Sequence, residues 1–147
     1  MPASNLGQNI LMASHASDAA GTNLSTTYAS FNLGSKPNGS APTRAYVSVP
    51  ENFAMDHLEI QMASLSGSPT TATVFLSWDS AGDYAATNEA TATIKTGKTT
   101  ATKGTALLVL NRTLIRPPGL GTAGSLYCWV KLDTGTATGV VRAYGKT

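Results

Sequence analysis

The sequence has almost none of the features that mark disulfide-rich, metal-binding or membrane-spanning proteins. Only one of its 147 residues, Cys128, is a cysteine, so no disulfide can form within the chain. No apolar run approaches the roughly 20 residues of a membrane span. Met1–Gly21 lacks the basic start and the apolar run of about seven residues that a signal peptide needs. We therefore expect no membrane partner, and we expect Cys128 to be a buried residue of the core rather than a reactive thiol.

Charge is also scarce, because charged residues make up 12% of the chain, about half of the usual share. A weakly charged surface gives little repulsion between molecules and suits packing against neighbours. The charges are divided unevenly: residues 1–90 have a net charge of −5 and residues 91–147 a net charge of +7. Either strands from both halves interleave and the charges mix on one surface, or opposite patches meet across a contact between subunits.

What the sequence has in plenty is strand-like alternation, and the clearest example is Thr71–Trp78. Val74, Leu76 and Trp78 recur at every second position, so we expect these three side chains to face a core. Asp79–Asp83 follows at once. Its two carboxylates could in principle bind calcium, but Asp and Gly directly after a strand are typical of a turn, and we interpret the segment as a turn.

The segment Phe53–Ala63 fits two patterns. Met55, Leu58 and Met62 would share one face of a helix, whereas Leu58, Ile60 and Met62 alternate as in a strand. We favour the strand, because the segment lies between other predicted strands.

The rest of the chain predicts an all-β domain over residues 22–147, preceded by an extended arm over residues 1–21. An unstructured terminus is the alternative for the arm. Gly34–Pro42 and Arg116–Gly124 are predicted loops, and Asp133–Thr136 a turn that closes a hairpin. About eight antiparallel strands with Gly and Pro between them favour a two-sheet β-sandwich, in particular a jelly roll. Besides the two segments above, the predicted strands are Thr22–Leu33, Thr43–Val49, Ala90–Lys95, Ala106–Leu110, Ser125–Leu132 and Gly139–Tyr144.

Chemistry-bearing residues are few. His15 and His57 have no Cys, His or carboxylate at metal-ligand spacing, and no motif of a nucleophile or phosphate-binding loop occurs. We therefore predict no catalytic, cofactor-binding or metal-binding residues. One basic group could form a nucleic-acid patch, but no aromatic residues are interleaved with it, so a solvated surface is the preferred interpretation. It consists of Lys95, Lys98, Lys103, Arg112 and Arg116.

Four segments form a pattern of strands and turns, namely Phe75–Asp83, Leu107–Arg112, Gly124–Thr136 and Val141–Tyr144. Together they resemble small structural proteins of tailed-bacteriophage virions, in particular capsid decoration or cement proteins with a jelly-roll core. The resemblance covers roughly residues 71–144 and is one of strands and turns. It implies a non-enzymatic subunit on the outside of a capsid, with the major capsid protein as partner and often a homotrimer, and hence a location on the virion.

A carbohydrate- or receptor-binding module of a phage fibre is the alternative. In such a module exposed aromatic residues, here Trp129 or Tyr84, would stack on a sugar. Strand alternation instead favours core positions for Trp78 and Trp129.

Overall fold

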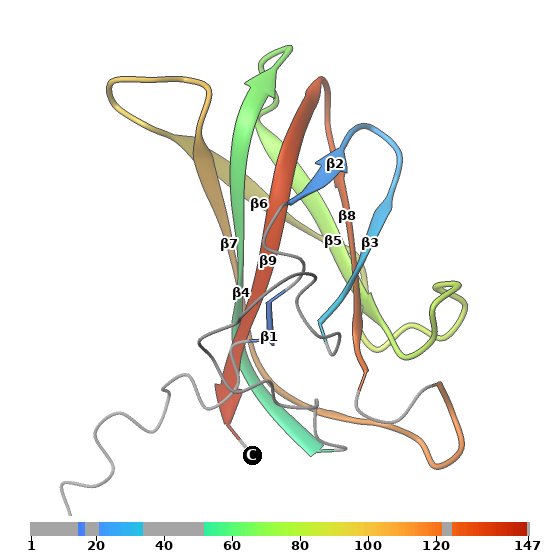
Figure 1. Ribbon diagram of the computed structural model, residues 1–147. Helices are drawn as coiled ribbons and strands as arrows, with labels where there is room; N and C mark the ends of the chain where they lie inside the picture. The colour runs from blue at the N-terminus through green and yellow to red at the C-terminus, as the bar shows by residue number, and fades with distance from the viewer. Residues whose placement is uncertain (1–14, 17–20, 34–51, 122–124, 147) are drawn as a thin grey trace, which may run out of the picture.

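The computed structural model describes residues 15–16, 21–33, 52–121 and 125–146. The described part of the chain is built from strands and turns (Figure 1). It contains no helix long and apolar enough to span a lipid bilayer. The strands are β1 (His15–Ala16), β2 (Thr22–Leu24), β3 (Ala29–Asn32), β4 (Asn52–Ser66), β5 (Thr71–Ser77), β6 (Ala90–Thr96), β7 (Gly104–Ile115), β8 (Tyr127–Leu132) and β9 (Thr136–Lys146).

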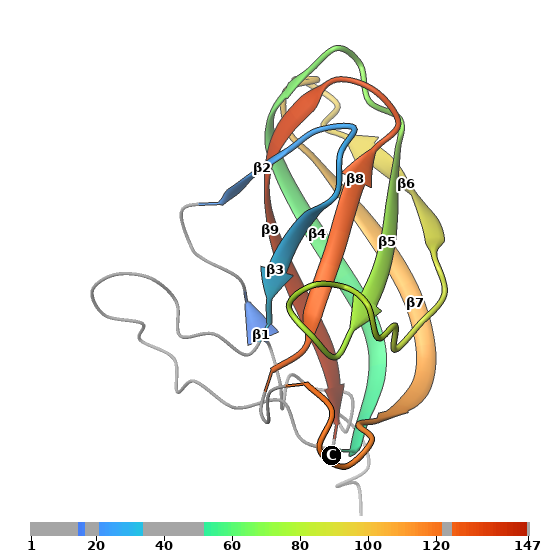
Figure 2. The same cartoon turned by 90° about the vertical axis from the view of Figure 1, so that its right-hand side faces the viewer.

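All pairings are antiparallel, and the strands follow one another in the order β1-β9-β4-β7-β6-β5-β8-β3. β2 also pairs with β9, along the edge that β4 leaves free, so nine strands occupy eight positions. The result is one sheet that curves into a nearly closed barrel, with β3, β8 and β5 in front of β9 and β4 in Figure 2. The prediction of an all-β domain with about eight antiparallel strands is confirmed.

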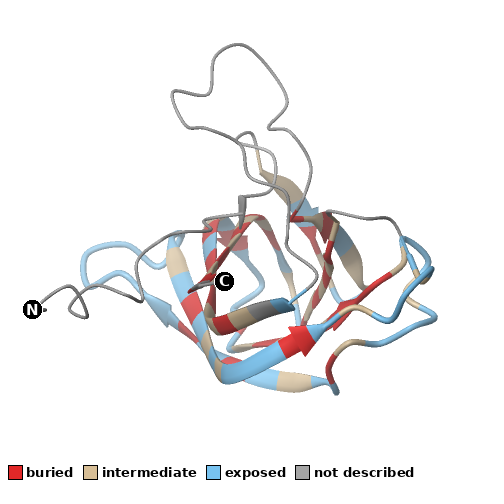
Figure 3. Ribbon diagram, turned by 90° about the horizontal axis from the view of Figure 1, so that it is seen from below, coloured by how far each residue is buried: buried red, intermediate tan, exposed pale blue. Residues whose placement is uncertain are grey.

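The expected pair of separate sheets is replaced by a continuous one, and β6 makes the connection. Its first residues, Ala90–Thr93, pair with β5, whereas Ile94–Thr96 pair with β7. A strand that changes partner in this way joins the two walls at a corner, and seen from below the strands enclose a common interior (Figure 3).

β4 settles the ambiguity of Phe53–Ala63 in favour of the strand. Its register against both neighbours shifts between Met55 and His57. Because of this irregularity Met55 lies on the inner side together with Leu58 and Ile60, all three at most 1% exposed. A bulge therefore produced the three-residue apolar spacing that resembled a helix.

The core fills the barrel with aliphatic side chains from every wall. Val74, Leu76 and Trp78 are buried as predicted, and so is Cys128. Trp129 is only partly buried, and the prediction that it belongs to the core was wrong. On β8 the inward positions are Cys128, Val130 and Leu132, which leaves Trp129 on the outer side.

The predicted closing hairpin was also wrong. β8 pairs with β3 and β5, whereas β9 pairs with β4, β1 and β2, so the turn after Leu132 connects opposite walls. The Asp133 carboxylate accepts hydrogen bonds from the backbone N–H groups of Thr70 (2.9 Å) and Thr71 (3.2 Å) and from the Thr70 hydroxyl. The turn is thus bound to the connection from β4 to β5, which also crosses between the walls, at the upper end in Figure 1.

Gly135 allows this turn to approach the neighbouring connection closely. Its φ is +72°, and a Cβ atom at this position would collide with the carbonyl oxygen of Ser66. Hydrogen bonds from Thr70 are the largest cause that lowers the pKa of the Asp133 carboxyl to about 2. We call the packed pair of connections, Ser66–Thr71 and Asp133–Thr136, the seam.

Several predicted elements lie wholly or mostly outside the described residues, namely Gly34–Pro42, Thr43–Val49 and most of the arm. Within the arm, His15 and Ala16 pair with Ala143 and Arg142 of β9. The predicted strand Thr22–Leu33 is divided into β2 and β3 by a bend at Ser25–Tyr28.

Candidate interaction surface

The residues that could carry chemistry are scattered or already bonded. No group of three or more His, Cys, Asp or Glu side chains that could hold a metal ion occurs among the described residues. The Nδ1 atom of His57 lies 3.0 Å from the Asp56 carboxylate on the outer side of β4. Burial raises the pKa of the Cys128 thiol, and a protonated thiol inside a core is a poor nucleophile.

Asp79 behaves as the turn prediction requires. Its carboxylate accepts hydrogen bonds from the backbone N–H groups of Asp83 (3.1 Å) and Tyr84 (2.8 Å). Desolvation acts to raise the pKa of Asp79, but these bonds outweigh it, and the pKa lies below its usual value. Both carboxylate oxygens therefore stabilise their own loop.

A cluster of aromatic side chains covers the outer side of β5 and β8. The rings of Phe75 and Trp129 stack in parallel at 5.9 Å, and Tyr28 meets Phe75 edge-on at 5.1 Å. The indole N–H of Trp129 donates to the Ser77 hydroxyl (2.8 Å). A Cβ atom at Gly82 would lie 3.1 Å from the indole ring, so the loop after β5 packs against it. Trp129 is thus engaged by its own chain.

Polar and charged residues border this cluster. The hydroxyl of Tyr28 donates to the Glu89 carboxylate (2.7 Å), and the Lys131 amine lies 4.7 Å from the centre of the Tyr28 ring. Burial, followed by the bond to Glu89, raises the pKa of Tyr28. Tyr84, which is 54% exposed, is the large aromatic residue that remains open to solvent next to the cluster.

The opposite wall has a broad outer side formed by three adjacent strands, which we call the β9–β4–β7 face. Strand register arranges it in three rows, each with a residue of β4 between one of β7 and one of β9. The rows are Thr105–Gln61–Val140, Leu107–Glu59–Arg142 and Val109–His57–Tyr144.

The β9–β4–β7 face is weakly charged. Within the three rows the formal charges are Glu59 and Arg142, whose Oε1 and Nη1 atoms are 3.8 Å apart, and this Nη1 atom makes no hydrogen bond to a described residue. The Asp56 carboxylate lies beside His57 at one end of the rows, and Lys95 and Lys103 lie at the other end. His57 stacks on Tyr144 with ring centres 4.6 Å apart. Most of the face is therefore available for contact without removing fixed charges from water.

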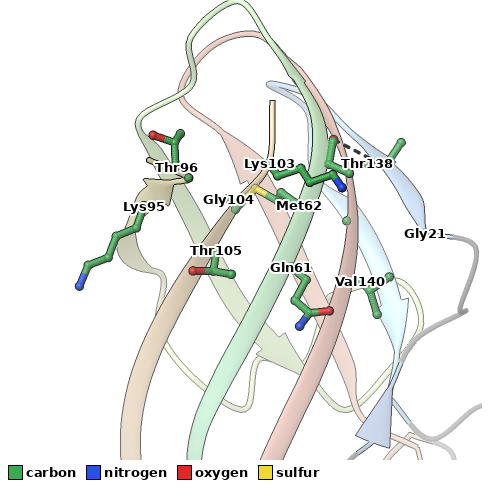
Figure 4. A pocket seen from close by; sticks show the side chains of 13 residues that line it. Gly21, Gln61, Met62, Lys95, Thr96, Lys103, Gly104, Thr105, Thr138 and Val140 are labelled. Atoms are coloured by element: carbon green, nitrogen blue, oxygen red, sulfur yellow. Dashed lines mark hydrogen bonds between the residues drawn. The ribbon is translucent and has the colours of Figure 1, made fainter. Parts of the chain in front are cut away.

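A groove of about 700 Å³ lies at the upper end of this face (Figure 4). Gln61, Thr105 and Val140 line it from the face itself, and Lys95 and Lys103 line it from the hairpin between β6 and β7. The structure does not gather the predicted basic group. Lys95, Lys98 and Lys103 lie around one end of β7, and Arg112 and Arg116 at the other end.

Exposed aliphatic side chains are the feature that the sequence did not reveal. Four large hydrophobic residues are prominently exposed in the described part of the chain, and β7 carries three of them. Leu107, Val109 and Ile115 are 55%, 59% and 65% exposed. Ala106–Leu110 lies within β7 as predicted; Ala106 is buried, whereas Leu107 and Val109 face outward.

Comparison of the chain with models of protein families, with curated proteins and with solved structures found no match.

Proposed function

We propose that this chain is a non-enzymatic structural protein of a tailed-phage virion, which binds the outside of the capsid through the β9–β4–β7 face. The observation that carries the proposal is the width and chemistry of this face: it is three strands wide, and within its three rows the fixed charges are the adjacent Glu59 and Arg142. Such a face suits a broad contact with the flat surface of a shell. The resemblance of residues 71–144 to decoration proteins supplies the kind of shell, with the major capsid protein as the partner.

The order of the strands supports a jelly roll as the finer description of the fold. β9, β4 and β7, with β1 and β2, form one wall, and β5, β8 and β3 form the other. The chain crosses between walls after β4, β7 and β8, as in an eight-stranded jelly roll built from two Greek keys. A rigid barrel of this kind holds its outer faces in fixed geometry, which a subunit that reinforces a shell requires.

Shell binding can be measured by co-sedimentation of the purified protein with capsid shells of the phage that encodes it. We expect wild-type protein to sediment with the shells. Gln61→Glu and Thr105→Glu place a charge on the face at exposed positions and should weaken binding at least tenfold. Thr91→Glu, at an exposed position of β6, is the matched control and should bind like wild type. Equal binding by all four proteins would exclude this face as the contact.

Sugar binding is the second candidate, and the observation that favours it is exposed Tyr84 beside the aromatic cluster. Both Phe75 and the Gly82 loop already pack against Trp129, so this ring offers less surface to a sugar than the sequence suggested. Binding to a glycan array that is lost in Tyr84→Ala, together with no sedimentation with shells, would establish the sugar-binding function instead.

A further inference from the structure

β7 is paired along one edge over its whole length and along the other edge only at its start. β4 lies opposite it from Gly104 to Ile115, whereas β6 pairs only with Gly104–Ala106. Beyond this point β6 turns away toward β5 (Figure 1). From Leu107 to Ile115, no described residue pairs with the second edge of β7. We call this nine-residue stretch the open edge.

An open edge presents a row of backbone N–H and C=O groups to which another strand can add. Proteins usually protect such edges with charges, prolines or short strands. Here the stretch is nine residues long, contains no proline and carries one charge, on Arg112. It also holds the exposed side chains of Leu107, Val109 and Ile115. The open edge therefore combines backbone that no described residue pairs with and exposed aliphatic surface.

We propose that the open edge pairs with the open edge of a second copy, antiparallel and around a two-fold axis at Asn111. In this register Leu107 lies opposite Ile115 of the second copy, and Val109 opposite Thr113. All three exposed aliphatic residues of β7 are then covered by one contact. Aliphatic and β-branched cross-strand pairs stabilise antiparallel sheets.

The irregular backbone of β7 agrees with this register. Asn111 has a φ of +47°, in the left-handed region, and interrupts the strand. Because Asn111 falls on the axis, Leu107–Leu110 of one copy faces Arg112–Ile115 of the other, and each half of the ladder is regular. Arg112, the single charge, lies opposite Leu110 and not opposite its own counterpart, which avoids a direct like-charge pair.

A second copy fits the open edge better than an unrelated strand for two reasons. The stretch is complementary to itself in the position of its aliphatic residues, and a two-fold contact closes with two molecules, which leaves no part of this β7 edge for further growth. The contact runs along the β7 border of the β9–β4–β7 face, with which it shares Leu107 and Val109, and it does not depend on the proposed function. It makes a dimer, where the resemblance alone suggested a trimer.

Disulfide trapping tests the register. At a two-fold axis of an antiparallel pair the two Cα atoms lie about 4.5–5.5 Å apart, within the range of a disulfide. Asn111→Cys should therefore cross-link to a covalent dimer under mild oxidation, whereas Thr91→Cys on β6 should not. The native Cys128 is fully buried and does not compete. As a second trap, a mixture of Val109→Cys and Thr113→Cys proteins should cross-link to each other in preference to themselves.

Light scattering after size exclusion tests the contact itself. Wild-type protein should have the mass of two chains, and Val109→Lys, altered at a 59% exposed position, the mass of one while it keeps the β-type circular dichroism spectrum of the folded chain. A wild-type monomer at every concentration would overturn the proposal. So would a trimer in which Asn111→Cys forms no cross-link, or a dimer that becomes monomeric when residues 1–14 are deleted, because the arm would then be the exchanged element.

Discussion

The packing of the seam can be tested with two glycines that have almost the same φ angle but different surroundings. Gly135 has a φ of +72° and Gly119 a φ of +75°. A Cβ atom at Gly135 would collide with the Ser66 carbonyl, whereas at Gly119 nothing lies within 4 Å. Replacing each by alanine separates the strain of the left-handed backbone from the steric clash.

Gly119→Ala should lower the free energy of unfolding by about 1–2 kcal/mol, since a Cβ atom disfavours the left-handed region by this amount. Gly135→Ala adds an overlap with main-chain atoms that cannot rotate away, which costs a further 1–3 kcal/mol, roughly as in an overpacked core. The difference between the variants corresponds to about 3–10 °C in melting temperature for a domain of this size.

The assay is thermal and urea unfolding of the two variants beside wild type. Both variants should remain folded at low temperature, so that circular dichroism shows a β-type spectrum before unfolding. Equal losses of stability in Gly119→Ala and Gly135→Ala would refute the close contact of the two connections. The explanation of why β8 and β9 lie in opposite walls, which depends on this contact, would then also be refuted.

Three further predictions concern the core and the loops. Trp78→Ala should lower the free energy of unfolding by about 3–5 kcal/mol, and the exposed Tyr84→Ala by less than about 0.5 kcal/mol; similar losses in urea unfolding would contradict the core position of Trp78. The folded-state pKa of Asp133, about 2, lies below the unfolded value of 3.8. The ionised carboxylate therefore adds to the free energy of unfolding above pH 3.8, and this stabilisation is lost as the pH falls toward 2. Asp133→Asn should lose less stability than wild type between pH 5 and about pH 2; an unchanged acid response of Asp133→Asn would refute this role. The Cys128 thiol should react with a thiol reagent only in denaturant, and rapid reaction of the native protein would show that the residue is accessible.

Local patterns predicted much of the fold. Alternation at Val74, Leu76 and Trp78 places three apolar side chains on one side of a strand, and in a barrel the apolar side of a strand faces the interior. The same rule failed at Trp129 because this residue is out of phase with Cys128 and Val130 on its own strand. It was ambiguous at Met55 because a bulge shifts the phase within β4.

The candidate surface could not be predicted in the same way. Glu59 lies between Leu107 and Arg142 because β4 is flanked by β7 and β9, and no short-range pattern states which strands become neighbours. The exposure of Leu107 and Val109 likewise depends on where β6 leaves β7. In the sequence these residues resemble any buried apolar strand.

Composition and alternation alone determined the all-β class, the absence of disulfides and the buried strand around Trp78, since these follow from the period of side chains along a pleated backbone. The tertiary structure decided which strands meet. β8 and β9 lie in opposite walls, and the turn between them is held by the contacts of Asp133 and Gly135. No described strand pairs with the second edge of β7 from Leu107 to Ile115. The physical reason is that every strand presents the same backbone hydrogen-bonding groups, so its partner is not specified by its own residues alone. Turn contacts and packing between distant parts of the chain determine which strands pair.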